Sequence, residues 1–150
     1  MNTNPNRQRQ PGRPTKRRGA ITLEAVMVFP LLLMIFFGSF EFAWMFYVRH
    51  TLSNAAREGA RVAIIEDATG GDVTSAVGSA ISNGGMSSID YTCVLKNGSS
   101  TISSPSSVAA GDPVTVTVKA PWSQFSVLNT PIASFWTSDI EVKATMRREG

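Results

Sequence analysis

A long apolar segment near the amino terminus limits what this chain can fold into. Residues 25–40 contain no charged side chain, and the wider segment 20–48 contains only two. About 20 apolar residues are enough for a helix to cross the hydrocarbon core of a bilayer. A helix on the surface of a soluble domain would instead carry a polar stripe. The segment 20–48 therefore predicts a transmembrane helix, with Trp44 and Tyr47 as interfacial anchors near its end.

The first 19 residues are basic and show no apolar pattern. Six of the 14 basic side chains precede Gly19, whereas residues 20–150 carry eight basic and eleven acidic groups. The net charge of +3 thus comes from this segment, and the rest of the chain lacks the basic face that nucleic-acid binding needs. Such a composition cannot bury enough surface to fold. We expect residues 1–19 to be a disordered basic leader that favours a cytoplasmic amino terminus.

The helical pattern continues beyond the predicted span, through residues 49–66. Small side chains recur four residues apart in it, Ala55 with Gly59 and Ala56 with Ala60. Small residues on a helix let a second backbone approach closely, so these four residues predict a packing face. Its partner is either the chain's own globular domain or a neighbouring subunit, and the sequence leaves both open.

Residues 67–150 have the pattern of a small extracytoplasmic α+β domain. A short helix is predicted around Val73, Val77 and Ile81. Three later segments alternate apolar with polar residues: 89–95, 114–118 and 140–146. Alternation with period two predicts strands with one covered face. A small antiparallel sheet must bury that face, and we expect the helix at 49–66 to cover it.

Glycine, proline and serine mark the predicted connections. Gly70-Gly71 is expected to interrupt the long helix. Asn97-Gly98 predicts a hairpin turn with a short return strand at 100–103, inside a serine-rich stretch, 99–107, that otherwise predicts a loop. A second loop at 123–138 contains four large apolar residues expected to cover the core: Phe125, Leu128, Phe135 and Trp136.

The chain offers few groups for catalysis. Cys93 is its one cysteine and His50 its one histidine, and no glycine-rich phosphate loop is present. We expect Cys93 to be a small buried hydrophobe and His50 an ordinary interfacial side chain. The sequence therefore predicts no catalytic residue, no metal, no cofactor and no small-molecule substrate, and the chain is not expected to be an enzyme.

The junction between leader and span carries a more specific motif. A basic run ends in Gly19, an apolar run begins at Ala20, and its fifth residue is Glu24. A carboxylate within a membrane segment is costly and usually has a partner or a role. This arrangement resembles the prepilin-peptidase site of type IV pilins and pseudopilins, in which cleavage follows the glycine. The resemblance implies cleavage between Gly19 and Ala20, and pairing of Glu24 with an α-amine that sets the register between subunits.

A longer match, dense over about residues 17–64, is similar to the TadE/TadG-like family. It is carried by these segments: Leu23–Ala25, Phe29–Leu33, Phe37-Gly38, Phe40–Phe42, Tyr47–Arg49 and Asn54–Arg61. The resemblance implies a pilin-like fold and a pseudopilin, a minor pilin-like component of tight-adherence (Flp-type) pilus assembly. It implies a bacterial inner-membrane protein with a cytoplasmic amino terminus. The implied partners are a prepilin peptidase, other pilins or pseudopilins, and tight-adherence platform proteins.

One alternative is a single-span, membrane-anchored binding or envelope module whose leader is not cleaved. Another is a secreted domain behind a signal peptide, but the apolar run is too long for the apolar region of such a peptide. Processing of the amino terminus distinguishes the first alternative from the pseudopilin, and alkaline carbonate extraction from membranes distinguishes the second.

Overall fold

The computed structural model describes residues 17–125 and 139–149 and divides into two compact units, residues 1–39 and 40–150. One long helix, α1 (Arg17–Ala63), supplies the described part of the first unit and the first element of the second. Apolar side chains of α1 are exposed through most of the first unit, whereas in the second unit α1 carries both exposed and fully buried ones.

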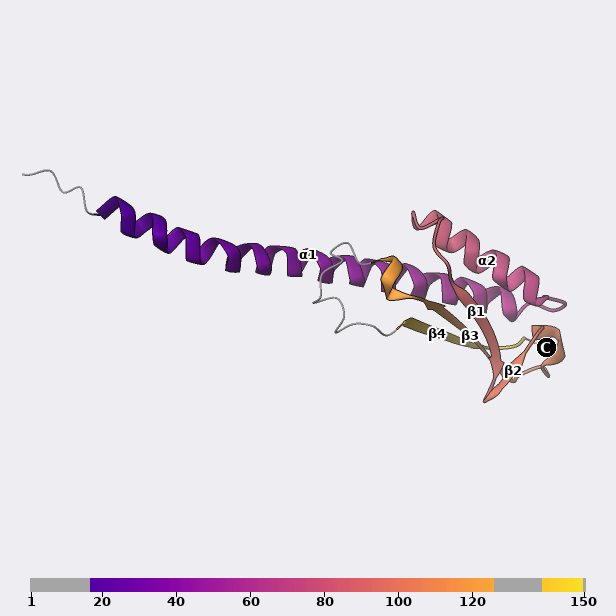
Figure 1. The fold of residues 1–150 in the computed structure, drawn as a ribbon. Coiled ribbons are helices and arrows are strands. Elements are labelled where there is room, and N and C mark those ends of the chain that lie inside the picture. Colours follow the sequence, from indigo (N-terminus) through magenta and orange to yellow (C-terminus); the bar gives the residue numbers. More distant parts are fainter. Residues whose placement is uncertain (1–16, 126–138, 150) are drawn as a thin grey trace, which may run out of the picture. The chain divides into compact units, whose positions relative to one another are not determined.

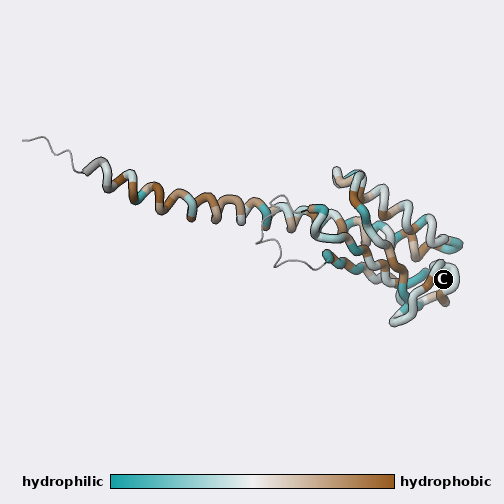
Figure 2. The backbone as a smooth tube through the Cα atoms, viewed as in Figure 1, coloured by the Kyte–Doolittle hydropathy of each residue, from teal (hydrophilic) through white to brown (hydrophobic). Residues whose placement is uncertain are grey.

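In the first unit, α1 continues through Pro30 with its apolar side chains exposed. The large hydrophobic side chains from Ile21 to Phe37 that are exposed retain between 44% and 76% of their accessible surface. Figure 2 shows the predominantly hydrophobic colouring of this stretch. A soluble protein rarely leaves so continuous an apolar surface in water. Since α1 is long and apolar enough to cross a bilayer, it is consistent with a single membrane anchor.

The second unit joins the rest of α1 to a second helix and a four-stranded sheet (Figure 1). Its further elements are α2 (Gly70–Asn83), β1 (Thr92–Asn97), β2 (Ser100–Ile102), β3 (Pro113–Ala120) and β4 (Ile140–Arg147). Single-turn 3₁₀ helices lie at Pro105–Ser107 and Trp122–Gln124. All strand pairs are antiparallel, in the order β2-β1-β3-β4. The α+β, pilin-like arrangement predicted from the sequence is confirmed.

The core lies between one face of this sheet and the two helices. Val118 of β3 is paired with Cys93 of β1 on one side and with Val142 of β4 on the other, so alternate residues of the three strands share a face. The side chains on that face form one buried cluster with side chains of α1 and of α2. The fully buried members from the helices include Val48, Leu52, Ala55, Ala56, Ala60, Ala63, Val73 and Val77.

The prediction that Gly70-Gly71 interrupts the long helix is wrong. The helix α1 ends earlier, at Ala63, and Gly70 instead opens α2. Thr69 caps α2, because its hydroxyl accepts from the Asp72 amide at 3.2 Å while the Asp72 carboxylate accepts from the Thr69 amide at 3.0 Å. This reciprocal capping satisfies two amide donors and allows a helix to begin on glycine.

Two other boundaries differ from the alternating pattern. The first strand begins at Thr92, not at residue 89, because the Asp90 amide donates to the side chain of Gln124 at 2.9 Å and not to a neighbouring strand. In the serine-rich stretch 99–107, the predicted return strand is present as β2, and the predicted loop after it contains a 3₁₀ turn at Pro105–Ser107. Of the four predicted cover residues, Phe125 is buried in the core; Leu128, Phe135 and Trp136 lie outside the described residues.

Candidate processing and assembly site

Gly19 and Ala20 lie in the first turn of α1, in the first unit. Gly19 is exposed, and a side chain added there would meet open space. The first turn contains no acidic residue but begins with Arg17 and Arg18. Positive charge at a helix amino terminus opposes the helix dipole.

Glu24 lies one turn after Ala20 and is exposed among apolar neighbours. It forms no ion pair with any residue in 17–125 or 139–149. Residues four apart on a helix are neighbours, so an α-amine created at Ala20 would lie beside the Glu24 carboxylate on the same helix. Among the described residues, the Glu24 carboxylate therefore has no opposite charge beside it.

The predicted packing residues lie in the second unit, apart in the sequence from Gly19, Ala20 and Glu24. Ala55, Ala56 and Ala60 have no exposed surface, and Gly59 is also buried. A Cβ placed on Gly59 would meet Val77 of α2 at 2.5 Å and Val116 of β3 at 3.3 Å. Gly59 therefore packs against the chain's own α2 and β3, and the three alanines are buried in the core of the same unit. Of the two partners that the sequence left open, this is the first.

Trp44 and Tyr47 do more than end the apolar segment. The Trp44 indole Nε1 donates to the Phe125 carbonyl at 2.9 Å, and the Tyr47 hydroxyl donates to the Gly84 carbonyl at 2.7 Å. The two rings stack with their centroids 5.4 Å apart. These bonds join α1 to the loops that follow α2 and β3, which the sequence did not indicate because each acceptor is a backbone carbonyl.

The environment of Glu41 is a feature that the sequence analysis did not predict. Both of its carboxylate oxygens are buried, yet neither has a hydrogen-bond partner among the described residues. Buried carboxylates are normally paired, so this one is unusual. The available signal was its position, as the second acidic residue in the apolar segment 20–48.

The remaining polar candidates are dispersed. Cys93 is half-buried, not fully buried as predicted, and burial raises the pKa of its thiol. The exposed His50 ring accepts at Nδ1 from the Asn54 side-chain amide at 3.2 Å. In the described part of the chain, no three histidine, cysteine or acidic side chains gather as a metal site would require.

Residues 19–61 match the family model described as TadE-like protein. Over these residues the chain is similar to TadE-like proteins. The TadE-like segment begins at Gly19, contains Glu24 and Glu41, and ends just after the buried small residues 55–60. Proteins of this family are associated with the Tad pilus and generally have no catalytic activity. No curated protein and no solved structure matches the chain.

Proposed function

We propose that this protein is a TadE-like pseudopilin, a non-enzymatic component of tight-adherence (Flp-type) pilus assembly in the bacterial inner membrane. The observation that carries the proposal is the family match itself, which begins at Gly19 and includes Glu24. The exposed apolar helix in the first unit supports it, because such a helix needs a bilayer or a bundle of similar helices around it.

The proposed organisation has four parts. Residues 1–19 are a cytoplasmic basic leader, and residues 20–48 cross the membrane. Residues 49–66 continue the helix outside the cytoplasm, and residues 67–150 complete the extracytoplasmic domain. The basic leader supports this orientation, because Lys and Arg favour the cytoplasmic side.

In this proposal a prepilin peptidase hydrolyses the Gly19–Ala20 peptide bond. Water is added across the bond, which leaves a carboxylate on Gly19 and a new α-amine on Ala20. The Glu24 carboxylate then pairs with the amine of its own or a neighbouring subunit and so sets the register of packed subunits. An ion pair in a membrane offsets part of the cost of each charge.

The intact mass of the membrane-extracted protein from its native host tests the processing step. We expect a chain that starts at Ala20. The Gly19→Leu variant should keep the leader, because the enlarged side chain blocks the scissile position. A wild-type protein that keeps residues 1–19 beside an active prepilin peptidase would contradict processing, and would favour a single-span anchored binding or envelope module.

The Glu24→Gln variant separates processing from assembly. We expect it to lose residues 1–19 normally but to co-purify with other pilins or pseudopilins and with platform proteins at a much lower level. Glu66→Gln is the matched control, since Glu66 is an exposed acid beyond the end of α1. Equal recovery of partners with both variants would show that Glu24 has no role in subunit registration.

A further inference from the structure

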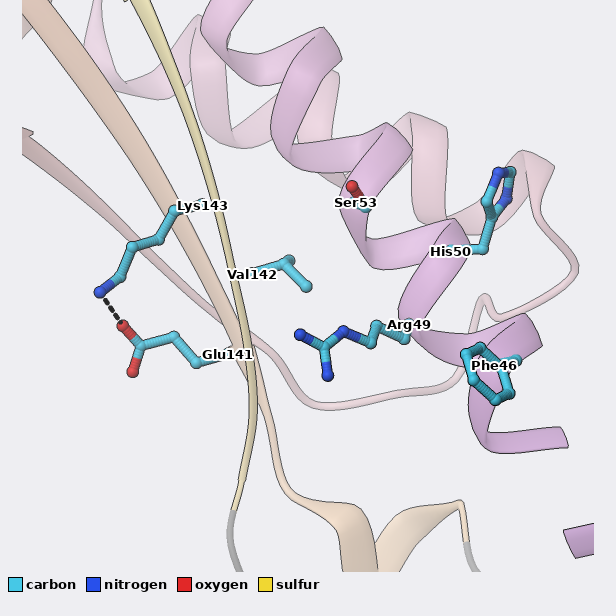
Figure 3. A pocket seen from close by; sticks show the side chains of 7 residues that line it. All are labelled: Phe46, Arg49, His50, Ser53, Glu141, Val142 and Lys143. Carbon is cyan, nitrogen blue, oxygen red and sulfur yellow. Dashed lines mark ion pairs between the residues drawn. The ribbon is translucent and has the colours of Figure 1, made fainter. Parts of the chain in front are cut away.

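A groove in the second unit lies between α1 and β4. It has a volume of about 560 Å³ and is lined by Phe46, Arg49, His50, Ser53, Glu141, Val142 and Lys143. Figure 3 shows the Arg49 side chain extending from α1 toward the strand, on the side of Val142. Glu141 and Lys143 lie on the other side of the strand and pair with each other.

The free charge in this groove is positive. Arg49 is exposed and forms no ion pair or hydrogen bond with any residue in the described ranges. Glu141, the acid that lines the groove, is already engaged by Lys119 and Lys143, each at 2.9 Å. A guanidinium without a carboxylate partner favours an anion, and its planar fork matches the oxygens of a phosphate.

The strand beside the groove is an edge of the described sheet. Within the described sheet, β4 pairs only with β3, so alternate amides and carbonyls of β4 point away from the sheet. Charged side chains on an edge strand disfavour the addition of another strand, and β4 carries Glu141, Lys143 and Arg147. The edge is therefore better suited to a polar ligand than to a partner strand.

The position of the groove along α1 indicates the source of the anion. Arg49 is the first basic residue after Gly19, and it directly follows the apolar segment 20–48. Basic and aromatic side chains at the end of a membrane helix lie at the level of the lipid headgroups. Phe46, which is 54% exposed, lies one turn before Arg49 and offers an apolar surface beside it. A membrane lipid can use both features, whereas a soluble phosphate uses only the cation.

We propose that this groove binds the headgroup phosphate of an anionic phospholipid, with the Arg49 guanidinium as its cation and Phe46 beside the start of the acyl chains. The site goes beyond the proposed function, since it requires only that α1 lies in a membrane. It would hold the domain at a defined depth against the bilayer surface.

Native mass spectrometry of the full-length protein in detergent tests the site, with phosphatidylglycerol and phosphatidylcholine as competing probes. We expect the wild type to retain phosphatidylglycerol preferentially, and Arg49→Gln to lower that preference about tenfold, the effect of losing one charge-assisted hydrogen-bonded contact. Arg57→Gln is the matched control, because Arg57 is an exposed arginine of the same helix that does not line the groove. It should retain the wild-type preference.

Three outcomes would overturn the proposal. The first is an Arg49→Gln protein with wild-type lipid preference and wild-type helix content by circular dichroism. The second is displacement of phosphatidylglycerol by equimolar inorganic phosphate, which would identify a soluble-phosphate site. The third is loss of chemical crosslinks between copies of the chain in Arg49→Gln without any change in lipid retention, which would assign Arg49 to a subunit contact. None of these measurements depends on the peptidase or on a pilus.

Discussion

A Cβ atom placed on Gly59 of α1 would lie 2.5 Å from Cγ2 of Val77 in α2. The two helices therefore meet at a distance that only glycine permits, and Val116 of β3 closes the same contact at 3.3 Å. The close approach explains why the small residues 55–60 form the buried side of α1. In this chain they bring α1 onto its own domain.

Gly59→Ala should destabilise the second unit by about 1–3 kcal/mol, the usual cost of overpacking a core. That cost opposes the gain in helix propensity of up to about 1 kcal/mol from replacing glycine by alanine. Gly38→Ala is the control, because a Cβ there meets nothing within 4 Å, and it should be neutral or stabilising. Urea unfolding in detergent measures both, and equal midpoints would contradict the tight contact.

Tyr47→Phe removes the hydroxyl that donates to the Gly84 carbonyl at 2.7 Å while it keeps the ring that stacks on Trp44. We expect a loss of about 0.5–1.5 kcal/mol, typical of one hydrogen bond, and faster amide exchange around the end of α2. Tyr91→Phe serves for comparison, since Tyr91 is a half-buried tyrosine of the same unit. Faster exchange of α2 in both variants would mean that the Tyr47 bond is not what secures the helix.

Thr69→Ala should weaken α2, because the Thr69 hydroxyl accepts from the Asp72 amide and donates to its carboxylate at 2.6 Å. These bonds also lower the pKa of Asp72. Loss of such a cap typically costs about 1 kcal/mol. Thermal unfolding of Thr69→Ala should therefore show a lower midpoint than that of Ser79→Ala, which changes an exposed mid-helix serine. A midpoint equal to that of Ser79→Ala would show that the cap is dispensable.

The stability of the second unit should fall at low pH, partly because the Glu141 carboxylate becomes protonated. Hydrogen bonds from Lys143 and Lys119 lower the pKa of Glu141 from 4.5 to about 2. A carboxyl group whose pKa is lower in the folded state stabilises the fold above its unfolded pKa, and that contribution is lost as the pH falls from about 4.5 to about 2. The effect is small, because the group is exposed.

Urea midpoints of the wild type and Glu141→Gln between pH 7 and pH 2 measure this contribution. We expect the wild type to be the more stable at neutral pH, with the difference vanishing near pH 2. A difference that stays constant with pH would exclude ionisation of Glu141 as its cause.

The type of each element follows closely from local pattern. Alternation predicted strands at 89–95, 114–118 and 140–146, which overlap β1, β3 and β4, and Asn97-Gly98 predicted the hairpin into β2. The first strand was misplaced at its start, because the Asp90 amide bonds a side chain 34 residues away. The start of α2 was missed because glycine pairs usually end helices, whereas here the reciprocal bonds of Thr69 and Asp72 outweigh that preference.

The sequence by itself determined the apolar helix with Glu24 near its start, the basic segment before it, and the class of the domain. These depend on composition and short-range periodicity, which local sterics and burial translate directly into structure. It was wrong to extend the disordered leader to Gly19, because α1 already begins at Arg17. Only the tertiary structure decided that Gly59 meets Val77, that the Glu41 carboxylate is buried with no hydrogen-bond partner among the described residues, and that Arg49 faces β4. Each of these depends on which surfaces meet across long stretches of chain, and packing of the whole domain sets that, not the local pattern.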